Sequence, residues 1–502
     1  MCIRDRILNT SLLFALASSA LAAPTLAQQA PKNWSGWLGA DHGVVTDGGP
    51  PTVWDEETNV SWKVPVPGRG LSSPVVVDGI IYLTTAVPTQ SEETKSAPET
   101  DGESEGQAED QPQDGRGGRR GPGGRPGGDA EGRRGGRGGG PGGRMAMTEA
   151  SEQEFRLLAL DLETGKTLWS KLATTLTPHE GTHADGSFAT PTVAVSGDHI
   201  IASFGSFGIF AYNKAGEELW SVDLGDQTVR GSFGEGTSPV IGGGNVIILW
   251  GHSGDSFLVA LDLETGKEAW RQVRAKGTNW STPTVTKVGD LEQVIVVGLS
   301  TQAYDAKTGE LVWSIGGDGK PSEEAEPDSG RRGRSNRGPI ATPLVANGRL
   351  ITTVGGRRGS IISVVLDSDA EDKGLDSERI AWKHDGDTPG IPTPLAIEGT
   401  LYVLKDGGQL GAFDVNSGEA HYTGERLEAV GSAYASLVAT PEHIYLTGRD
   451  GSFEVVQAGK EFKSIAVNML DDKFDATPAI VGDRLLLRGF HSLYCIAAPS
   501  KE

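Results

Sequence analysis

The stretch ALDLETGK occupies residues 159–166 and occurs again, unchanged, at residues 260–267. A tryptophan follows each copy at the same distance, as Trp169 and Trp270. Weaker copies are AYNKAGEELW at 211–220, AYDAKTGELVW at 303–313 and GAFDVNSGEAHY at 411–422. A phrase that recurs every ~40–60 residues indicates a repeat architecture, so the repeats decide how the whole chain is divided.

Each copy of the phrase predicts a strand, a tight turn and a second strand. Its Asp can cap backbone N–H groups inside the turn, and its Gly can adopt a positive φ without a Cβ penalty. The Trp four residues after the Gly is a large apolar anchor that could lie between neighbouring repeats. The residues that we assign to this docking motif are Trp62, Asp161, Gly165, Trp169, Trp220, Asp262, Gly266, Trp270, Asp305, Gly309, Trp313 and Trp382.

Eight segments open in a common way, with a small residue, Ser or Thr, and usually Pro ahead of alternating apolar residues. They are Ser72-Ser73-Pro74, Ala189-Thr190-Pro191, Thr237-Ser238-Pro239, Ser281-Thr282-Pro283, Ala341-Thr342-Pro343, Pro392-Thr393-Pro394, Ala435-Ser436-Leu437 and Ala476-Thr477-Pro478. Four short strands in each repeat of about 40–50 residues are typical of a β-propeller blade. The sequence therefore predicts an all-β protein, an eight-bladed β-propeller of four-stranded blades over residues 59–499.

The two ends of the chain favour a closed ring. The last repeat lacks a fourth strand and its Trp, and an isolated strand around Trp62 offers both. We expect this N-terminal strand to complete the last blade, because closure removes the free edges of a curled sheet. Residues 28–58 are expected to form a leader segment over the domain surface. The docking Trp is replaced by Tyr422 in blade six and, on spacing, by Lys463 in blade seven.

Composition places the chain among soluble exported proteins. Its 502 residues carry a net charge of −22, which argues against nucleic acid as a partner. The two cysteines, Cys2 and Cys495, cannot build a disulfide framework or a cysteine-based metal site. We expect Cys495 to be a buried apolar residue in the last repeat.

The N-terminus resembles an export signal. Arg4 and Arg6 precede an apolar run at 7–22, and Ala27 ends a small-residue cleavage site. We therefore predict a signal peptide at 1–27 and a secreted protein of the periplasm or cell envelope. No Cys follows the apolar run, so a lipoprotein is not expected, and neither is a membrane span. We expect a monomer.

Two charged segments interrupt the repeats. Residues 88–151, within blade one, are first acidic and then rich in Arg and Gly, and residues 318–337, between blades four and five, repeat that charge order. Neither can form a core, so we predict disorder. They are either tolerated surface insertions or contact arms for an anionic polymer or a protein partner.

Three clusters offer candidate chemistry, each with a structural alternative. His179 and His183 are four residues apart and form either a metal or ligand site or a polar loop. Trp250, His252 and Asp255 either line the channel as ligand contacts or cap a turn. The acidic cluster Asp471, Asp472 and Asp475 lacks the Gly and Glu of an EF-hand loop and is expected to be a solvated turn. No nucleophile, P-loop or zinc-protease motif is present, so no catalytic residue and no metal ligand is assigned.

The repeated phrase resembles the tryptophan-docking motif of quinoprotein propellers, and the chain is similar to the family of PQQ-binding-like β-propeller repeat proteins (PQQ is pyrroloquinoline quinone). The stretches that carry the resemblance include Asn33-Trp-Ser-Gly-Trp, Asn59-Val-Ser-Trp-Lys-Val-Pro, His179-Glu-Gly-Thr-His, Phe204-Gly-Ser-Phe-Gly and the Thr-Pro openings. Many such proteins are similar to the scaffold of the outer-membrane β-barrel assembly machinery. Quinoprotein dehydrogenases share the fold and add a vicinal Cys–Cys ring and calcium, but this chain has no cysteine pair.

The resemblance implies a fold more than a chemistry. We expect a non-catalytic, exported propeller that serves as a scaffold or binding platform for an envelope protein or polymer, without PQQ, calcium or another cofactor. The alternatives are a PQQ-dependent oxidoreductase with an atypical site and a glycan-binding propeller.

Overall fold

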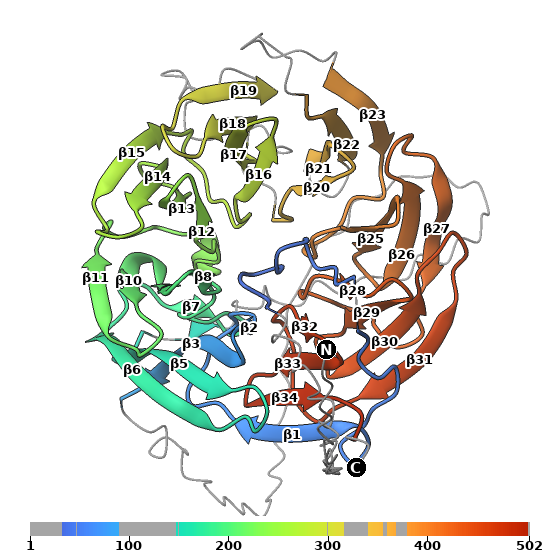
Figure 1. Ribbon diagram of the computed structural model, residues 1–502, viewed down its shortest axis with the longest axis horizontal. Helices are drawn as coiled ribbons and strands as arrows, with labels where there is room; N and C mark the ends of the chain where they lie inside the picture. The colour runs from blue at the N-terminus through green and yellow to red at the C-terminus, as the bar shows by residue number, and fades with distance from the viewer. Residues whose placement is uncertain are drawn as a thin grey trace, which may run out of the picture.

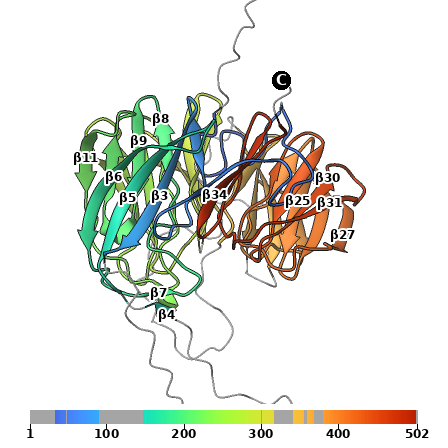
Figure 2. The same ribbon diagram turned by 90° about the horizontal axis from the view of Figure 1, so that it is seen from below.

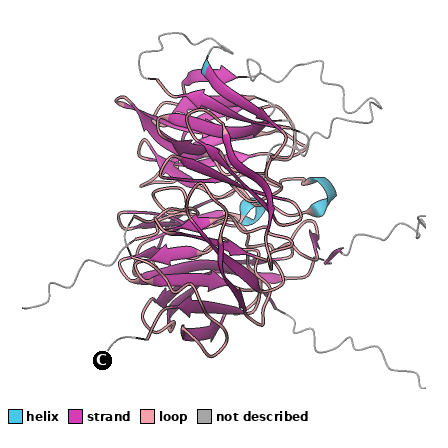
Figure 3. Ribbon diagram, turned by 90° about the vertical axis from the view of Figure 1, so that its right-hand side faces the viewer, coloured by secondary structure: helices cyan, strands magenta, loops and turns pink. Residues whose placement is uncertain are grey.

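The computed structural model describes residues 33–46, 48–89, 147–148, 150–298, 300–315, 340–354, 359–367 and 379–499. Within them, eight four-stranded antiparallel sheets stand as blades in a ring around a central axis (Figure 1). Strands form most of the ring, and the short helical turns lie among the loops (Figure 3). The predicted eight-bladed β-propeller is therefore confirmed.

The first four blades follow the chain from the inner strand to the rim. Blade one is β2 (Val75–Val77), β3 (Ile80–Pro88), β5 (Gln153–Asp161) and β6 (Thr167–Leu176). Blade two is β8 (Ala194–Ser196), β9 (His199–Ser203), β10 (Ile209–Tyr212) and β11 (Glu218–Val222). Blade three is β12 (Val240–Gly242), β13 (Asn245–Trp250), β14 (Phe257–Asp262) and β15 (Glu268–Val273). Blade four is β16 (Thr284–Val288), β17 (Leu291–Val296), β18 (Thr301–Asp305) and β19 (Leu311–Ile315).

The remaining blades repeat the pattern. Blade five is β20 (Leu344–Ala346), β21 (Arg349–Val354), β22 (Ser360–Val365) and β23 (Ile380–Asp385). Blade six is β24 (Leu395–Ile397), β25 (Thr400–Lys405), β26 (Gln409–Asp414) and β27 (Ala420–Arg426). Blade seven is β28 (Val438–Ala439), β29 (His443–Thr447), β30 (Ser452–Gln457) and β31 (Ser464–Met469). Blade eight is β32 (Ala479–Val481), β33 (Arg484–Arg488), β34 (Ser492–Ile496) and β1 (Val60–Pro65).

The N-terminal strand closes the ring. β1 pairs with β34 in an antiparallel register that places Trp62 opposite Cys495. Blade eight therefore joins the two ends of the described ring, and the predicted closure is confirmed. Cys495 is fully buried, as expected.

The docking tryptophans connect each blade to the next. The indole N–H of Trp220 in blade two donates to the carbonyl of Leu263 in blade three, at 2.9 Å. The bonds Trp62 to Leu162, Trp169 to Lys214, Trp270 to Ala306 and Trp382 to Val415 repeat this contact between other neighbouring blades. Each indole thus spans a blade boundary with both an apolar surface and one hydrogen bond.

The glycine of each phrase makes room for the ring of the preceding blade. Gly266 has a φ of +67°, and a Cβ there would lie 2.7 Å from the ring of Trp220. Asp262 holds the turn in shape through two hydrogen bonds. Its carboxylate accepts one from the backbone N–H of Thr265, and its backbone carbonyl accepts one from the N–H of Gly266. The Asp, Gly and Trp of the phrase are therefore one structural unit.

Three blades depart from the docking pattern. Trp313 donates to the side chain of Gln293 in its own blade. In blade six Tyr422 lies opposite Ala412, in the register of the docking Trp, as expected. In blade seven the equivalent residue is Ala466, which lies opposite Val455, and not Lys463, which precedes β31. The prediction of Lys463 was wrong because it was counted from Gly459, which packs against no ring of the preceding blade. The turn is also one residue longer here, since it closes from Gln457 to Lys463, whereas that of blade three closes from Asp262 to Lys267.

A row of hydroxyl groups links the blades where they open. In blades one to seven, the backbone N–H two residues before the first strand donates to the Ser or Thr hydroxyl at the same position in the next blade. The bonds run from Ser73 to Thr192, Ser238, Thr282, Thr342, Thr393, Ser436 and Thr477, each residue donating to the one that follows. We call this row the hydroxyl belt. It explains why these openings carry Ser or Thr.

The belt corrects the predicted opening of blade two. The hydroxyl in the belt belongs to Thr192 rather than to Thr190, which instead donates to the carbonyl of Ser187. Pro191 precedes the belt residue here, whereas in six other blades the Pro follows it. The position of the belt residue is therefore defined by its distance from the first strand of the blade, and not by the Thr-Pro pair.

A buried arginine ties blade eight to blade one. Arg488, at the end of β33, is 2% exposed. Its guanidinium donates to the carbonyls of Ser72 at 2.9 Å and Thr84 at 2.7 Å, and also to the Ser72 hydroxyl. A Cβ at residue 70 would lie 2.2 Å from Nη2 of Arg488, so Gly70 leaves the space that this side chain fills.

Two tryptophans anchor the described part of the leader to the blades. Trp34 and Trp54 are only 1% and 2% exposed, whereas most residues around them are exposed or half-buried. Trp34 forms backbone hydrogen bonds with Val76 in blade one, and Trp54 packs against Phe453 in blade seven at a ring distance of 5.6 Å. The sequence did not reveal these anchors, because polar residues surround both tryptophans.

The ring has two faces with different functions in the fold. The loops between second and third strands and the linkers between blades lie on one face, which we call the loop face. The turns that carry the docking glycines lie on the other, the turn face. β4 (Met147–Thr148) and β7 (Thr182–His183) pair on the loop face (Figure 2).

The described strands that flank both charged segments end at the loop face. Residues 88–151 connect β3 to β5, and residues 318–337 connect β19 to β20. Most of the first segment and all of the second lie outside the described residues. The predicted disorder of 88–151 does not hold at its ends, because Thr89 donates to Glu152 and Met147–Thr148 form β4.

Among the residues that the structure describes, no helix has the length and apolar character needed to cross a bilayer.

We predict that Gly266→Ala lowers the melting temperature more than Gly244→Ala. Both glycines have positive φ, +67° and +80°, which costs an L-residue about 1–2 kcal/mol. Only at Gly266 would the new Cβ also meet an indole, since no atom lies within 4 Å of a Cβ at Gly244. Thermal unfolding followed by circular dichroism measures the difference. Equal losses would contradict the docking role of the glycine.

Candidate functional site

A cleft opens on the loop face where the linkers around blades two, three and four meet. It is shallow: the enclosed space is about 10 Å³, roughly the room for one water molecule. Its polar wall includes Gln227, Glu235 and Asn279, and its aromatic wall includes Trp250 and Trp280. These side chains come from three consecutive parts of the ring, so the cleft exists only when the blades are docked.

Glu235 is the central titratable group of the cleft. Its carboxylate accepts hydrogen bonds from the backbone N–H of Ser206 at 2.9 Å, from the Ser206 hydroxyl at 2.5 Å and from Nε2 of Gln227 at 2.6 Å. Burial raises the pKa of Glu235 to about 7, against the opposing effect of these donors. Gly205 has no side chain to displace it, because a Cβ there would lie 1.8 Å from the carboxylate.

Aromatic side chains border the cleft. Trp250 is 2% exposed and stacks on Phe257 with ring centroids 5.9 Å apart. Trp280 is partly exposed, donates its indole N–H to the carbonyl of Gly234 at 2.9 Å and lies edge-on to Phe233 at 6.3 Å. His183 continues this row at 5.3 Å from Phe233. The partly exposed row offers flat apolar contact area to a ligand or partner.

The structure does not join His179 and His183 into one site. Nε2 of His179 lies 2.8 Å from the carbonyl of Gln227. His183 lies in β7, and its Nδ1 accepts a hydrogen bond from the backbone N–H of Asp185. Both rings are therefore engaged in loop contacts, which favours the polar-loop interpretation over a metal site.

His252 caps its own turn. Its Nδ1 accepts a hydrogen bond from the N–H of Thr228 at 3.0 Å, and its Nε2 lies 3.1 Å from the carbonyl of Asp255. Burial lowers the pKa of His252, which favours the neutral ring that this bonding requires. The carboxylate of Asp255 is exposed and pairs with Lys276 at 3.0 Å. Of the trio Trp250, His252 and Asp255, only Trp250 lines the cleft.

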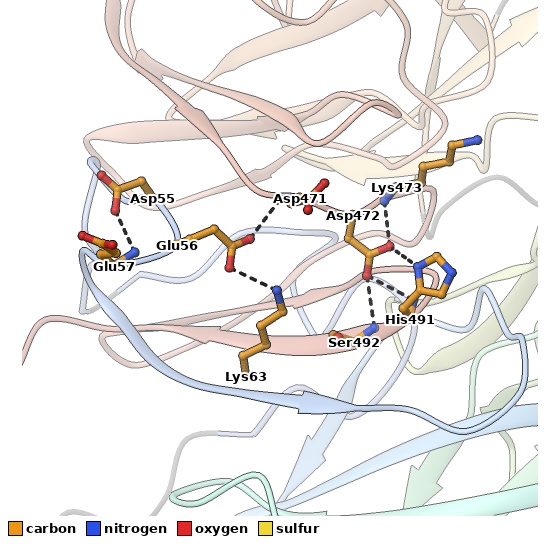
Figure 4. Close-up of polar contacts among 9 residues, drawn as sticks. All are labelled: Asp55, Glu56, Glu57, Lys63, Asp471, Asp472, Lys473, His491 and Ser492. Carbon is orange, nitrogen blue, oxygen red and sulfur yellow. Dashed lines mark hydrogen bonds and ion pairs between the residues drawn. The ribbon is translucent and has the colours of Figure 1, made fainter.

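The acidic cluster before the last opening is structural, and most of it is not solvated. Asp472, with a 2% exposed side chain, accepts hydrogen bonds from the backbone N–H groups of Lys473, His491 and Ser492 (Figure 4). Asp475 forms two bonds with the guanidinium of Arg449, at 2.7 and 3.0 Å. The expectation of a solvated turn thus holds only for the exposed Asp471.

Sequence reasoning missed Glu235, Gln227, Asn279 and Trp280. The available signal was position, because Glu235 and Trp280 come just before the openings of blades three and four. Residues at that point of each repeat lie at the mouth of the channel on the loop face. Their contacts run between linkers, so the spacing within one repeat does not reveal them.

Comparisons with known proteins agree on the architecture. A family model described as outer membrane protein assembly factor BamB matches residues 135–228 and 208–337. The two matched stretches lie within 135–337, which is less than half of the chain, so they show a likeness over blades one to four. Among curated protein sequences, no match is found.

Two solved structures resemble this propeller. BamB from Moraxella catarrhalis is 15% identical over 71% of this chain and 99% of its own, with a TM-score of 0.47. The quinohemoprotein alcohol dehydrogenase from Comamonas testosteroni is 13% identical over 94% of this chain and 81% of its own, with a TM-score of 0.50. At these identities the likeness concerns the fold.

The residues of this propeller do not fit the cofactor site that the quinoprotein resemblance implies. That site needs a vicinal cysteine pair and acidic and amide ligands for calcium. The cysteine among the described residues, Cys495, is buried in β34. Glu235 is already bonded to Ser206 and Gln227, and no group of three His, Cys, Asp or Glu residues in the described ranges could hold a metal ion.

We predict that wild type loses more stability than Glu235→Gln between pH 5 and pH 8. The folded pKa of about 7 lies above the ordinary value near 4.5, so the folded state binds more protons in this range. The stabilisation is therefore present below pH 4.5 and is lost as pH rises through 7. Urea unfolding at both pH values measures it. Glu310→Gln, an exposed change on the turn face, serves as control, and its stability should change with pH as that of wild type does. If the stability of Glu235→Gln also changed with pH as that of wild type does, the raised pKa of Glu235 would be contradicted.

Proposed function

We propose that this chain is a non-catalytic, exported propeller that holds an envelope protein against its loop face. One observation carries the proposal: the cleft and the attachment points of both charged segments share this face. The matched family model spans 135–337 and includes the whole cleft, and its name, an outer membrane assembly factor, points to protein partners.

The bonding of the cleft supports holding rather than chemistry. Its one carboxylate with a pKa near 7, that of Glu235, is fixed by three donors. The hydroxyl beside it, that of Ser206, donates to Glu235 and accepts a hydrogen bond from the backbone N–H of Gln227, so it is committed to the loop structure. Both ring nitrogens of His252 are engaged, Nδ1 by the backbone N–H of Thr228 on the linker from blade two and Nε2 by the carbonyl of Asp255 in its own turn. What the cleft does offer is partly exposed indole surface from Trp280 beside carbonyl and amide groups, which suits an extended peptide segment.

The charged segments suit the same role. Each contains an acidic and an Arg-rich part, and each is anchored at the loop face by described strands. Charges around a docking surface accelerate encounter and select partners more than they add affinity. We therefore assign them to capture of the partner, and the cleft to its retention.

We predict that a photo-reactive amino acid at Thr237, which lines the cleft, cross-links a defined envelope protein when the exported chain is irradiated in a bacterial periplasm. The same group at Ala215, on the turn face, should give no such product. Trp280→Ala in the Thr237 background should reduce the yield severalfold, because the indole supplies much of the contact area. Equal labelling from Thr237 and Ala215 would contradict the assignment of the loop face.

A quinone titration separates this function from the oxidoreductase alternative. With PQQ and calcium added to the purified chain, we expect no bound quinone absorbance and no dye-linked oxidation of alcohols or sugars. Stoichiometric quinone binding with turnover would overturn the non-catalytic proposal, whatever the cross-linking result.

A further inference from the structure

At the boundary between blades seven and eight, the docking unit is incomplete on both sides. Blade seven has Ala466 at the position where most blades have a Trp. Blade eight has Thr58 four residues before Trp62, at the position that a glycine occupies in blades one, three and four. Its third and fourth strands, β34 and β1, are far apart in sequence, so no continuous turn joins them. The repeated unit therefore does not hold this boundary.

The leader takes the place of the missing docking turn. In blade three, Gln272 stands two residues after the docking Trp, and its side-chain amide donates to the carbonyl of Gly309 in the next blade at 2.8 Å. Asn468 is the equivalent residue of blade seven, but its amide N–H donates to the carbonyl of Thr52 in the leader at 3.0 Å. The amide oxygen of Asn468 accepts the backbone N–H of Trp54 at 2.8 Å. The leader thus makes the contact that a docking turn makes at the next boundary elsewhere.

Trp54 supplies the indole that blade seven lacks. Its ring lies edge-on to Phe453 at 5.6 Å and stacks on Tyr445 at 6.4 Å, both in blade seven. The same buried apolar cluster includes Ile480 and Val481 of blade eight. One indole of the leader therefore fills the apolar space between these two blades, as the docking tryptophans do at other boundaries.

The first part of the leader crosses the middle of the ring. At blade two, the carbonyl of Ser35 accepts the backbone N–H of Val195 at 3.2 Å. At blade seven, the N–H of Val45 donates to the carbonyl of Ala439 at 2.9 Å. The dark-blue trace in Figure 1 runs through the centre of the ring between these points. The leader therefore connects blades that lie on either side of the closing blade.

The closing strand β1 continues directly from the leader, and Glu56 joins both to blade seven. Its carboxylate pairs with Lys63 of β1 at 3.0 Å and accepts the backbone N–H of Asp471, which follows β31, at 2.9 Å (Figure 4). We call the leader and β1 together, residues 33–46 and 48–65, the N-terminal arm. All of its anchors lie on blades one, two, seven and eight, which are the blades that ring closure brings together.

We propose that the N-terminal arm is a strap that locks the ring, and that the ring opens first by release of this arm as one unit, in which β1 leaves β34. Most residues of the arm are exposed or half-buried, whereas the second and third strands of the blades are mostly buried, and segments with few buried contacts open at low free energy. The belt bond from Ser436 to Thr477 does not involve the arm, so the inner strands stay joined while the rim opens. This device is independent of the proposed function of the loop face.

The thiol of Cys495 reports the opening directly. It is fully buried in β34, opposite Trp62 of β1. Ala260 is the matched position of blade three, since it is equally buried and lies opposite Trp270. The measurement is the rate of thiol labelling by an excess of a chromogenic aromatic disulfide at increasing urea concentration. One chain carries Cys2→Ser, and the control chain carries Cys2→Ser, Cys495→Ala and Ala260→Cys.

Cys495 should be labelled at least about tenfold faster than the thiol of the control chain, and its rate should depend less on urea, because a local opening exposes less surface than global unfolding. Equal labelling rates with equal urea dependence would show that both positions open only by global unfolding, which would overturn the proposal.

Variants of the leader test whether the arm moves as one unit. Trp54→Ala should raise the labelling rate of Cys495 at least about tenfold, and Val53→Ala should leave it unchanged because Val53 is exposed. Gly43→Ala should also raise the rate, since the new Cβ would lie 2.9 Å from the carbonyl of Leu437 at the inner end of blade seven. Gly36→Ala is its control, because no atom lies within 4 Å of a Cβ there. A rate that either Trp54→Ala or Gly43→Ala leaves at the wild-type value would overturn the proposal.

Discussion

The hydroxyl belt is the constraint on which the structure depends. Each backbone N–H of the belt is buried at the narrowest part of a blade and must find an acceptor, because an unsatisfied buried donor costs about 1–3 kcal/mol. In blades one to seven the acceptor is the Ser or Thr hydroxyl of the next blade, and Arg488 joins blade eight to blade one instead. The belt fixes the inner radius of the ring, and the docking tryptophans fix its outer spacing.

This double fixation explains where function can lie. The turn face is occupied by the Asp and Gly units that hold the indoles, so its residues are committed to the fold. The loop face carries the linkers, whose lengths the blades do not dictate, and loops on a rigid frame are common sites of binding. Glu235 and Trp280 lie on linkers, only a few residues before the belt residues of blades three and four. The belt therefore holds both side chains in place on the loop face.

Much of the fold could be predicted because it depends on residues that recur from one repeat to the next. The number of blades, the docking phrase and the closing strand with Trp62 each follow from spacing. Errors arose where a residue has a neighbour in space that the repeat does not show. The longer turn of blade seven puts the docking position at Ala466 and not at Lys463. The leader hid two core residues, Trp34 and Trp54, among polar ones.

The candidate site was less predictable for the same reason. The histidines that attracted attention, His179, His183 and His252, are engaged by nearby backbone groups, whereas Glu235 acquires its character from Ser206 and Gln227 on other loops. A carboxyl group whose pKa depends on three converging segments leaves no motif in one sequence. Its proximity to an opening was the only local sign.

Hydrogen exchange of the belt amides tests the central claim most directly. If the belt joins the blades into one frame, peptides that contain the openings at Ser73, Thr192, Ser238, Thr282, Thr342, Thr393 and Ser436 should exchange slowly and with the same free energy of opening, that of global unfolding. Thr393→Val should lower that value in all of them, since it removes the acceptor of Thr342. Openings that exchange with separate free energies, or a loss confined to blades five and six, would contradict the account.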